Sequence, residues 1–210
     1  MRGREGSRLW MYVMGVLVAG QVCASSIQVT VDTSSLSGSS ADLAFDLLDG
    51  GPPANSVTIS SFASDGTLGS TIALTGDVTG TLPGPVTIGD GSAFNEYFQD
   101  ITLGNSLSFI FDTTGNPADI GAGSSADAFS FFLLDAQTGA TLLGPDGFPL
   151  LLYSIGEVEP LQVFSESVQT SEVPASVPEP NTLALIFAGV LGLSLTRTAK
   201  NNFARKLLFL

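Results

Sequence analysis

Apolar and polar residues alternate with a period of two over much of the middle of this chain. The ranges 27–31, 43–47 and 107–111 each place an apolar residue at every second position. Such alternation is typical of a β-strand with one buried face. The run Phe129–Leu134 is apolar on both faces, which is typical of a central strand. The pattern therefore predicts an all-β domain.

Turn residues separate these segments and divide the domain into short strands. Asp-Gly pairs occur at 49–50, 65–66, 90–91 and 146–147, and such pairs tolerate the positive φ of tight turns. Regularly spaced turns predict an antiparallel β-sandwich, which we expect to be jelly-roll-like, over residues 25–164. Only Phe94–Asp100 has the spacing of a helical turn. Further strands are expected at Ser56–Phe62, Thr71–Leu74, Val86–Ile88, Ile101–Leu103, Leu150–Ser154 and Leu161–Phe164.

The first 24 residues have the pattern of a secretory signal peptide. Three arginines, at positions 2, 4 and 8, precede the apolar run Leu9–Ala19. Val22-Cys23-Ala24 then places side chains that a signal peptidase accepts, so we expect cleavage between Ala24 and Ser25. The apolar run is shorter than the roughly 20 residues of a spanning helix, which favours cleavage over permanent anchoring.

The last part of the chain combines a linker, a short motif, an apolar run and a basic tail. Residues 165–176 are rich in Ser, Glu and Thr, and they predict an extended linker. The apolar run 182–196 has no charged side chain and predicts a single hydrophobic helix. By the positive-inside rule the basic tail stays in the cytoplasm and the β domain lies outside. The motif is Val177, Pro178, Glu179 and Pro180, and the basic residues are Arg197, Lys200, Arg205 and Lys206.

This order of motif, apolar helix and basic end resembles the PEP-CTERM sorting signal, over residues 177–210. The resemblance implies that an exosortase, an integral-membrane cysteine protease or transpeptidase, recognises the chain in a bacterium that makes exopolysaccharide. The helix would anchor the protein in the membrane until the exosortase cuts near the motif. The body also resembles a subgroup of PEP-CTERM proteins at Val29–Ser37, Leu74–Gly80, Leu82–Val86, Asp90–Ala93 and Phe94–Gly104. That second resemblance implies no biochemical activity.

Charge is distributed very unevenly along the chain. Residues 9–196 contain no Lys or Arg, the chain has no His, and every acidic residue except Glu5 lies in this segment. Binding of nucleic acid by the body is therefore excluded, because it requires clustered cations. The acidity favours solubility, and divalent cation binding is the alternative. For a cation, Asp112, Asn116, Asp119 and Asp127 offer oxygens near one loop, without the spacing of an EF-hand.

Few residues of the body suit catalysis. The only cysteine of the chain, Cys23, lies in the signal peptide, and the body has no His, Lys or Arg. The mature domain therefore lacks the usual general bases, Schiff-base amines and thiol nucleophiles, although carboxylates remain. We therefore predict a protein that is not an enzyme and has no cofactor and no metal. A glycosidase-like carboxylate pair is the alternative. No spacing singles out a pair among Asp46, Asp49, Glu96, Asp100 and Asp135.

Sugar binding is the other functional alternative, because β-sandwiches often carry it. Sugar platforms favour Trp and Tyr rings, and in the mature domain only Tyr97 and Tyr153 qualify. Our main prediction is an exported cell-surface or extracellular-matrix protein, associated with exopolysaccharide or biofilm. A carbohydrate-binding module and a permanently anchored single-span membrane protein are the two alternatives.

Overall fold

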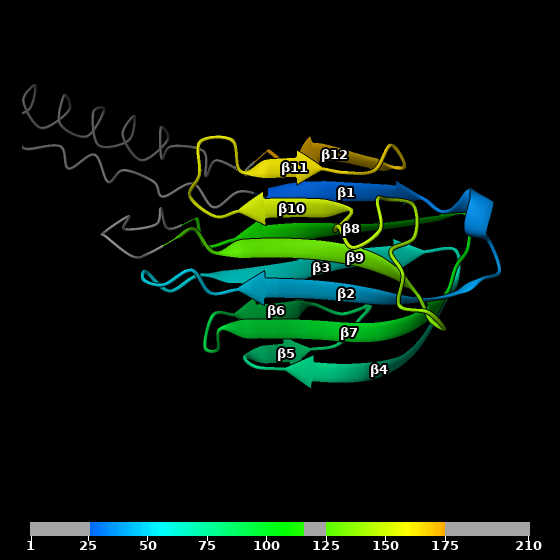
Figure 1. The fold of residues 1–210 in the computed structure, drawn as a ribbon, viewed down its shortest axis with the longest axis horizontal. Coiled ribbons are helices and arrows are strands. Elements are labelled where there is room, and N and C mark those ends of the chain that lie inside the picture. The colour runs from blue at the N-terminus through cyan, green and yellow to red at the C-terminus, as the bar shows by residue number, and fades with distance from the viewer. Residues whose placement is uncertain (1–25, 116–124, 175–210) are drawn as a thin grey trace, which may run out of the picture. The chain divides into compact units, whose positions relative to one another are not determined.

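The computed structural model describes residues 26–115 and 125–174, and almost all of their regular secondary structure is β-strand (Figure 1). One short 3-10 helix, η1 (Ser34–Leu36), follows the first strand. Within the described residues no helix is long and apolar enough to cross a membrane. The strands are β1 (Ser26–Asp32), β2 (Ser40–Leu48), β3 (Ser56–Ser64), β4 (Thr67–Thr75), β5 (Val78–Gly80), β6 (Val86–Gly89), β7 (Phe94–Thr102), β8 (Ser106–Thr113), β9 (Ala128–Asp135), β10 (Leu151–Ser154), β11 (Leu161–Val163) and β12 (Val168–Glu172).

These strands form two six-stranded sheets in which every pairing is antiparallel. Sheet A has the order β12-β1-β8-β3-β6-β5, and sheet B has the order β11-β10-β9-β2-β7-β4. Strands β1 to β4 alternate between the sheets, so each sheet is assembled from segments that are distant in the sequence. In sheet B, Phe45 of β2 lies opposite Tyr97 of β7 and Phe131 of β9.

Phenylalanine side chains fill the core between the two sheets. The ring centroid of Phe109, in sheet A, lies 5.1 Å from that of Phe45 and 5.0 Å from that of Phe131, both in sheet B. Phe111 and Phe129 make a similar contact between the sheets at 5.0 Å. All five rings are completely buried. The contacts show a sandwich of two packed sheets, which confirms the all-β prediction.

Strand β7 corrects the helical turn predicted for Phe94–Asp100. Tyr97 and Phe98 lie three and four residues after Phe94, which is a helical spacing. The whole segment is nevertheless an extended strand between β2 and β4. Its inward positions are Asn95, Tyr97, Gln99 and Ile101, so two polar side chains stand where alternation would place apolar ones. Because two of these inward residues are polar and Phe98 points outward, the period of two is hidden in the sequence.

Strand β12 corrects the linker predicted for residues 165–176. It pairs with β1 over five residues, from Val31 opposite Val168 to Ile27 opposite Glu172. The backbone N–H of Val173 also donates to the carbonyl of Ser26, at 2.8 Å. Val168 is the only buried residue of β12, so the segment carries no alternation that would signal a strand. The β domain therefore extends past residue 164, and β5 is a further strand that the sequence pattern did not predict.

Candidate functional site

Strand β7 turns the polar side chains of Asn95 and Gln99 into the core and the ring of Phe98 toward the outer face of sheet B. Asn95 and Gln99 are 0% and 2% exposed, whereas Phe98 lies on the outer face and is half-buried. The side chain of Asn95 accepts a hydrogen bond from the backbone N–H of Asp77 at 2.8 Å and donates to the carbonyl of Leu47 at 3.2 Å. These bonds offset the cost of burying an amide.

The hydroxyl of Tyr97 is the centre of the second buried polar group. It donates to Oε1 of Gln99 and accepts from the backbone N–H of Leu82 at 3.0 Å. The hydroxyls of Thr71 and Thr81 both lie 3.4 Å away. A slip of β7 by one residue would bury its outward side chains and break all of these bonds. The polar core therefore fixes which residues of β7 form the outer face.

The outer face of sheet B carries an ordered set of carboxylates and phenylalanines, which we name the acidic-aromatic face. Ala44 is only 2% exposed although it points outward, and its register partners on the two sides are Phe98 and Phe132. The carboxylates stand on either side of this apolar row. The three cross-strand rows are Ser130–Asp46–Glu96, Phe132–Ala44–Phe98 and Leu134–Asp42–Asp100.

Asp46 and Glu96 lie directly opposite each other on β2 and β7. Such partners have Cα atoms about 5 Å apart, so their side chains are neighbours. Burial, and then the charge of Glu96, raise the pKa of Asp46 to about 7. Burial also raises the pKa of Glu96. The Oδ1 atom of Asp46 is buried and has no hydrogen-bond partner among the described residues. Near neutral pH, Asp46 is therefore protonated in much of the population.

Asp42 and Asp100 form a second opposed pair, on the other side of the apolar row. Burial, and then the charges of Asp100 and Asp135, raise the pKa of Asp42. The Oδ1 atom of Asp100 is buried without a hydrogen bond inside the described part of the chain. The carboxylate of Asp100 lies over Gly69 of β4, where a Cβ would come within 2.3 Å of Oδ1. A larger residue at position 69 would therefore require this carboxylate to move.

The acidic-aromatic face suits a ligand that offers hydroxyl donors and an apolar surface. Its carboxylates accept hydrogen bonds, and the protonated form of Asp46 can donate one. The segment 9–196 has no Lys or Arg, so no cation neutralises the face and it repels anions. No group of three or more Asp or Glu side chains suited to a metal ion occurs among the described residues.

Of the five carboxylates considered for catalysis, the structure makes register partners only of Asp46 and Glu96. Asp49 is exposed in the loop after β2. Asp135 holds a turn, where it accepts from the backbone N–H of Thr138 at 2.8 Å. Asp42, a further carboxylate of this face, was not among the candidates predicted from the sequence. Its pairing with Asp100 depends on the register of two strands, and no local sequence signal gives that register.

The structure corrects the sugar platform that we predicted at Tyr97 and Tyr153. Their side chains are 0% and 4% exposed, so neither ring can stack on a sugar at the surface. The ring of Tyr153 instead packs edge-on against Phe111 in the core, with centroids 5.3 Å apart. Both tyrosines occupy inward positions of their strands, β7 and β10.

The oxygens considered for calcium do not gather in the described residues. Asp127 is 2% exposed and joins two loops by accepting from the backbone N–H of Gly50 at 2.6 Å and from Nδ2 of Asn55 at 2.7 Å. Asp112 lies on the outward side of β8, in sheet A. Asn116 and Asp119 fall outside the described residues. The carboxylate of Asp127 therefore has a structural role.

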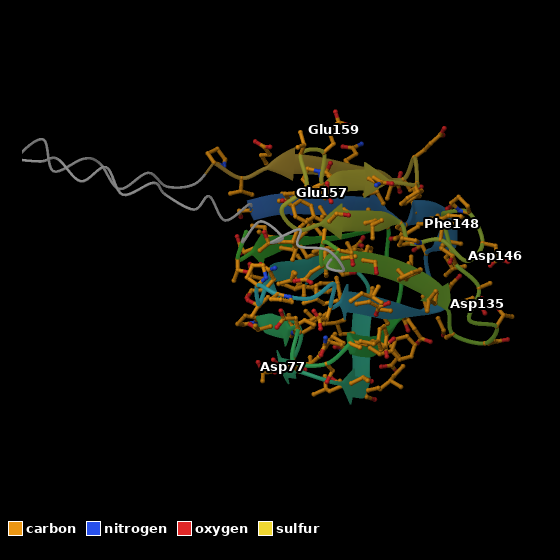
Figure 2. All side chains as sticks on the ribbon, turned by 60° about the vertical axis from the view of Figure 1, so that its left-hand side comes forward. Asp77, Asp135, Asp146, Phe148, Glu157 and Glu159 are labelled. Carbon is orange, nitrogen blue, oxygen red and sulfur yellow. The ribbon has the colours of Figure 1, made fainter. Side chains whose placement is uncertain are left out.

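Two of the hollows on the described surface each contain a single carboxylate. A hollow of about 340 Å³ beside β1 contains Asp32, which already accepts from the backbone N–H of Ser34 at 3.0 Å. A smaller hollow of about 200 Å³ beside β4 contains Asp100. Figure 2 shows Asp77, Asp135, Asp146, Glu157 and Glu159 at separate places around the periphery of the domain. Neither hollow holds the two carboxylates that glycoside hydrolysis requires.

The remaining predicted site residues lie outside the described residues. They are the cleavage site at Ala24 and Ser25, the motif at Val177, Pro178, Glu179 and Pro180, and the basic residues Arg197, Lys200, Arg205 and Lys206.

Comparison with known proteins gives one match, at the C-terminus. Residues 176–197 match the PEP-CTERM protein-sorting motif. The matched segment contains the Val-Pro-Glu-Pro motif, the apolar run and Arg197. No curated protein and no solved structure matches the chain. The sorting motif implies an exported protein that is anchored in the membrane for processing by an exosortase.

Proposed function

We propose that this chain is a non-enzymatic structural protein of the cell surface or extracellular matrix, associated with exopolysaccharide in a biofilm. The observation that carries the proposal is the sorting motif at residues 176–197, which follows a complete β-sandwich. A signal peptidase first removes residues 1–24, between Ala24 and Ser25. The apolar run 182–196 then holds the chain in the membrane, with the basic tail in the cytoplasm, until the exosortase cuts near Pro178.

The charge distribution supports this order of events. All seven Lys and Arg residues lie at positions 2–8 and 197–206, which are the segments that the two cleavages remove. The product is a cysteine-free domain whose charged side chains are all carboxylates. Such a domain stays apart from nucleic acid and anionic surfaces, and it suits a hydrated matrix in which proteins must not precipitate.

The description as non-enzymatic is supported by the distribution of reactive groups. The body has no His, Lys, Arg or Cys side chain after removal of the signal peptide. Its two opposed carboxylate pairs, Asp46–Glu96 and Asp42–Asp100, lie on a sheet face, and neither hollow contains both members of a pair. Catalysis by two carboxylates needs a substrate held between them in a water-poor site.

A motif variant tests the proposal in the host bacterium. Replacing Pro178, Glu179 and Pro180 by alanine should leave the full-length chain in the membrane fraction and remove it from the cell surface and medium. The matched control is Pro174→Ala, a proline change just before the matched segment, which should leave release unchanged. A full-length wild-type chain in the cytoplasm would overturn the proposal. A wild-type chain that remains intact in the membrane would instead favour the permanent single-span alternative.

Carbohydrate binding is the second candidate function, and the acidic-aromatic face favours it. The strand order β1-β8-β3-β6 in one sheet and β2-β7-β4 in the other supports a jelly-roll-like fold, an architecture that includes lectin domains. The ring of Phe98 would contact an apolar sugar face, and Glu96 would accept hydrogen bonds from its hydroxyls. The acidic-aromatic face, and not the two buried tyrosines, is therefore the proposed sugar-binding site.

A glycan array tests this second function. Binding that falls at least about tenfold in Phe98→Ala and in Glu96→Gln, which corresponds to about 1.4 kcal/mol, would support it. The matched control is Phe148→Ala, because Phe148 is 53% exposed and lies in the loop between β9 and β10. Absence of binding to both neutral and acidic glycans would remove carbohydrate binding as a function of this face.

A further inference from the structure

Strand β4 is the longest of the four strands that end the two sheets. The sheet orders leave one edge each on β12 and β5 in sheet A and on β11 and β4 in sheet B. The other three edge strands have five, three and three residues, whereas β4 has nine. Figure 1 shows β4 at the lower end of sheet B, with no further strand beyond it. Long edges offer unpaired backbone groups to an added strand.

The side chains of β4 lack the usual protection against pairing. Residues 67–75 contain no charged residue and no proline, although charged side chains and proline are the common means of blocking an edge. Ile72 and Leu74 are 52% and 51% exposed, in a strand where only Leu68 and Ala73 are even partly covered. Two register shifts against β7, on either side of Thr71, interrupt the strand and leave 73–75 as its regular end. The edge is therefore open over a short segment.

The distribution of carboxylates favours a second copy of this domain as the partner at the β4 edge. Every ionisable side chain of the segment 25–174, tyrosines apart, is a carboxylate, so two copies repel each other over most of their surfaces. The nine residues of β4 carry none of these carboxylates, and the nearest along the chain, Asp65 and Asp77, lie beyond its two ends. The carboxylate of Asp100, which lies over Gly69, belongs to β7, the next strand inward. The edge at β12 contains Glu172, and Asp77 directly precedes β5. Strand β4 is thus the long edge along which two copies can meet without opposed carboxylates.

We propose that two copies of this domain associate through antiparallel pairing of their β4 strands, which joins sheet B of each copy into one continuous sheet. A two-fold axis places the same strand on both sides, so the exposed Ile72 and Leu74 of each copy are covered by the other. The short regular segment makes the association weak and dependent on concentration. Repulsion between the acidic bodies opposes it, so added salt strengthens the dimer.

Sedimentation velocity at increasing concentration tests the proposal on the chain that is released from the cell surface. The expected result is a monomer that converts to a dimer as concentration rises, with a lower dissociation constant at higher salt. Ile72→Glu should raise the dissociation constant at least about tenfold, because it adds one carboxylate from each copy to the paired edge, where the like charges repel. Leu74→Glu should act in the same direction, and circular dichroism checks that both variants are folded.

The matched control is Val163→Glu. Val163 is 41% exposed and lies on β11, the edge at the other end of sheet B, so this variant should dimerise like the wild type. Hydrogen exchange provides the second measurement, in which the amides of β4 should become protected as concentration rises. A wild-type protein that stays monomeric at every concentration and salt level would overturn the proposal. A Val163→Glu variant that loses the dimer as fully as Ile72→Glu would also overturn it.

Discussion

The β domain and the C-terminal sorting segment differ in how their sequences carry information. The sorting segment is a linear pattern of motif, apolar run and basic residues, and comparison with known proteins matches it at residues 176–197. The domain depends on contacts between distant strands, such as the packing of Phe109 on β8 against Phe45 on β2. A contiguous sorting motif can be recognised without a folded domain. The acidic-aromatic face of the domain exists only after the strands of sheet B have paired. Variants in the domain should therefore change its stability without moving the site of C-terminal processing.

Phe109→Ala should have the largest effect on the domain. The ring is completely buried and contacts Phe45 and Phe131 across the core. We expect a loss of about 3–5 kcal/mol in the free energy of unfolding, measured by denaturant titration. Phe148→Ala, at a half-exposed ring, should cost less than about 1 kcal/mol. If the folded fraction of Phe109→Ala were cut at a different C-terminal position from the wild type, C-terminal processing would not be independent of the domain.

Asp46→Asn should stabilise the domain at neutral and alkaline pH. The pKa of Asp46 is raised from 3.8 to about 7. Between these two pH values, the carboxyl of Asp46 is protonated in the folded state and ionised in the unfolded state. Stability contributed by that proton is present below about pH 4 and is lost as the pH rises to about 7. The asparagine variant avoids this loss. Above pH 7 its free energy of unfolding should therefore exceed that of the wild type, by at most about 4 kcal/mol. Denaturant titrations from pH 4 to pH 8 should show the two proteins diverging as pH rises.

Asp32→Asn provides the control with opposite sign. Hydrogen bonds from the side chain and backbone of Ser34 lower the pKa of Asp32, so its charged form stabilises the fold at neutral pH. That contribution disappears as the pH falls through the lowered value. The variant should therefore be slightly less stable than the wild type at neutral pH and equal to it in acid. Equal pH profiles for Asp46→Asn and Asp32→Asn would contradict the electrostatic description of the acidic-aromatic face.

Tyr97→Phe should have a smaller effect, confined to the polar part of the core. The change removes the hydroxyl that bonds Gln99 and the backbone N–H of Leu82, and it leaves both partners buried. The expected loss is about 1–3 kcal/mol in the free energy of unfolding. Tyr153→Phe is the matched control, because the hydroxyl of Tyr153 has no hydrogen bond to any described residue. A Tyr153→Phe variant that loses as much as Tyr97→Phe would show that the buried hydrogen bonds of β7 contribute nothing specific.

Two consecutive strands show which parts of the fold could be predicted from the sequence. Strand β8 has apolar residues at every second position from Leu107 to Phe111, and its burial follows that pattern. Strand β7 places Asn95 and Gln99 in the core and Phe98 outside, so its pattern predicted a helical turn instead. Hydrogen bonds to partners distant in sequence, such as that from Asn95 to Leu47, decide this arrangement, and no local pattern encodes them.

The candidate site was less predictable than the fold, because it depends on register. Asp46 and Glu96 are fifty residues apart in the sequence, and only the pairing of β2 with β7 makes them neighbours. The two tyrosines predicted as a sugar platform are buried for the same reason, since their inward positions follow from strand pairing. The sorting motif was predictable because its recognition depends on a contiguous segment.

Mass spectrometry of the mature surface form tests the central claim most directly. The claim is that an exosortase removes the C-terminal segment and leaves the β domain without any Lys or Arg. The expected product begins at Ser25 and ends near Pro178, so its mass lacks both the signal peptide and the apolar run 182–196. A surface form that still ends at Leu210 would contradict exosortase processing of this chain.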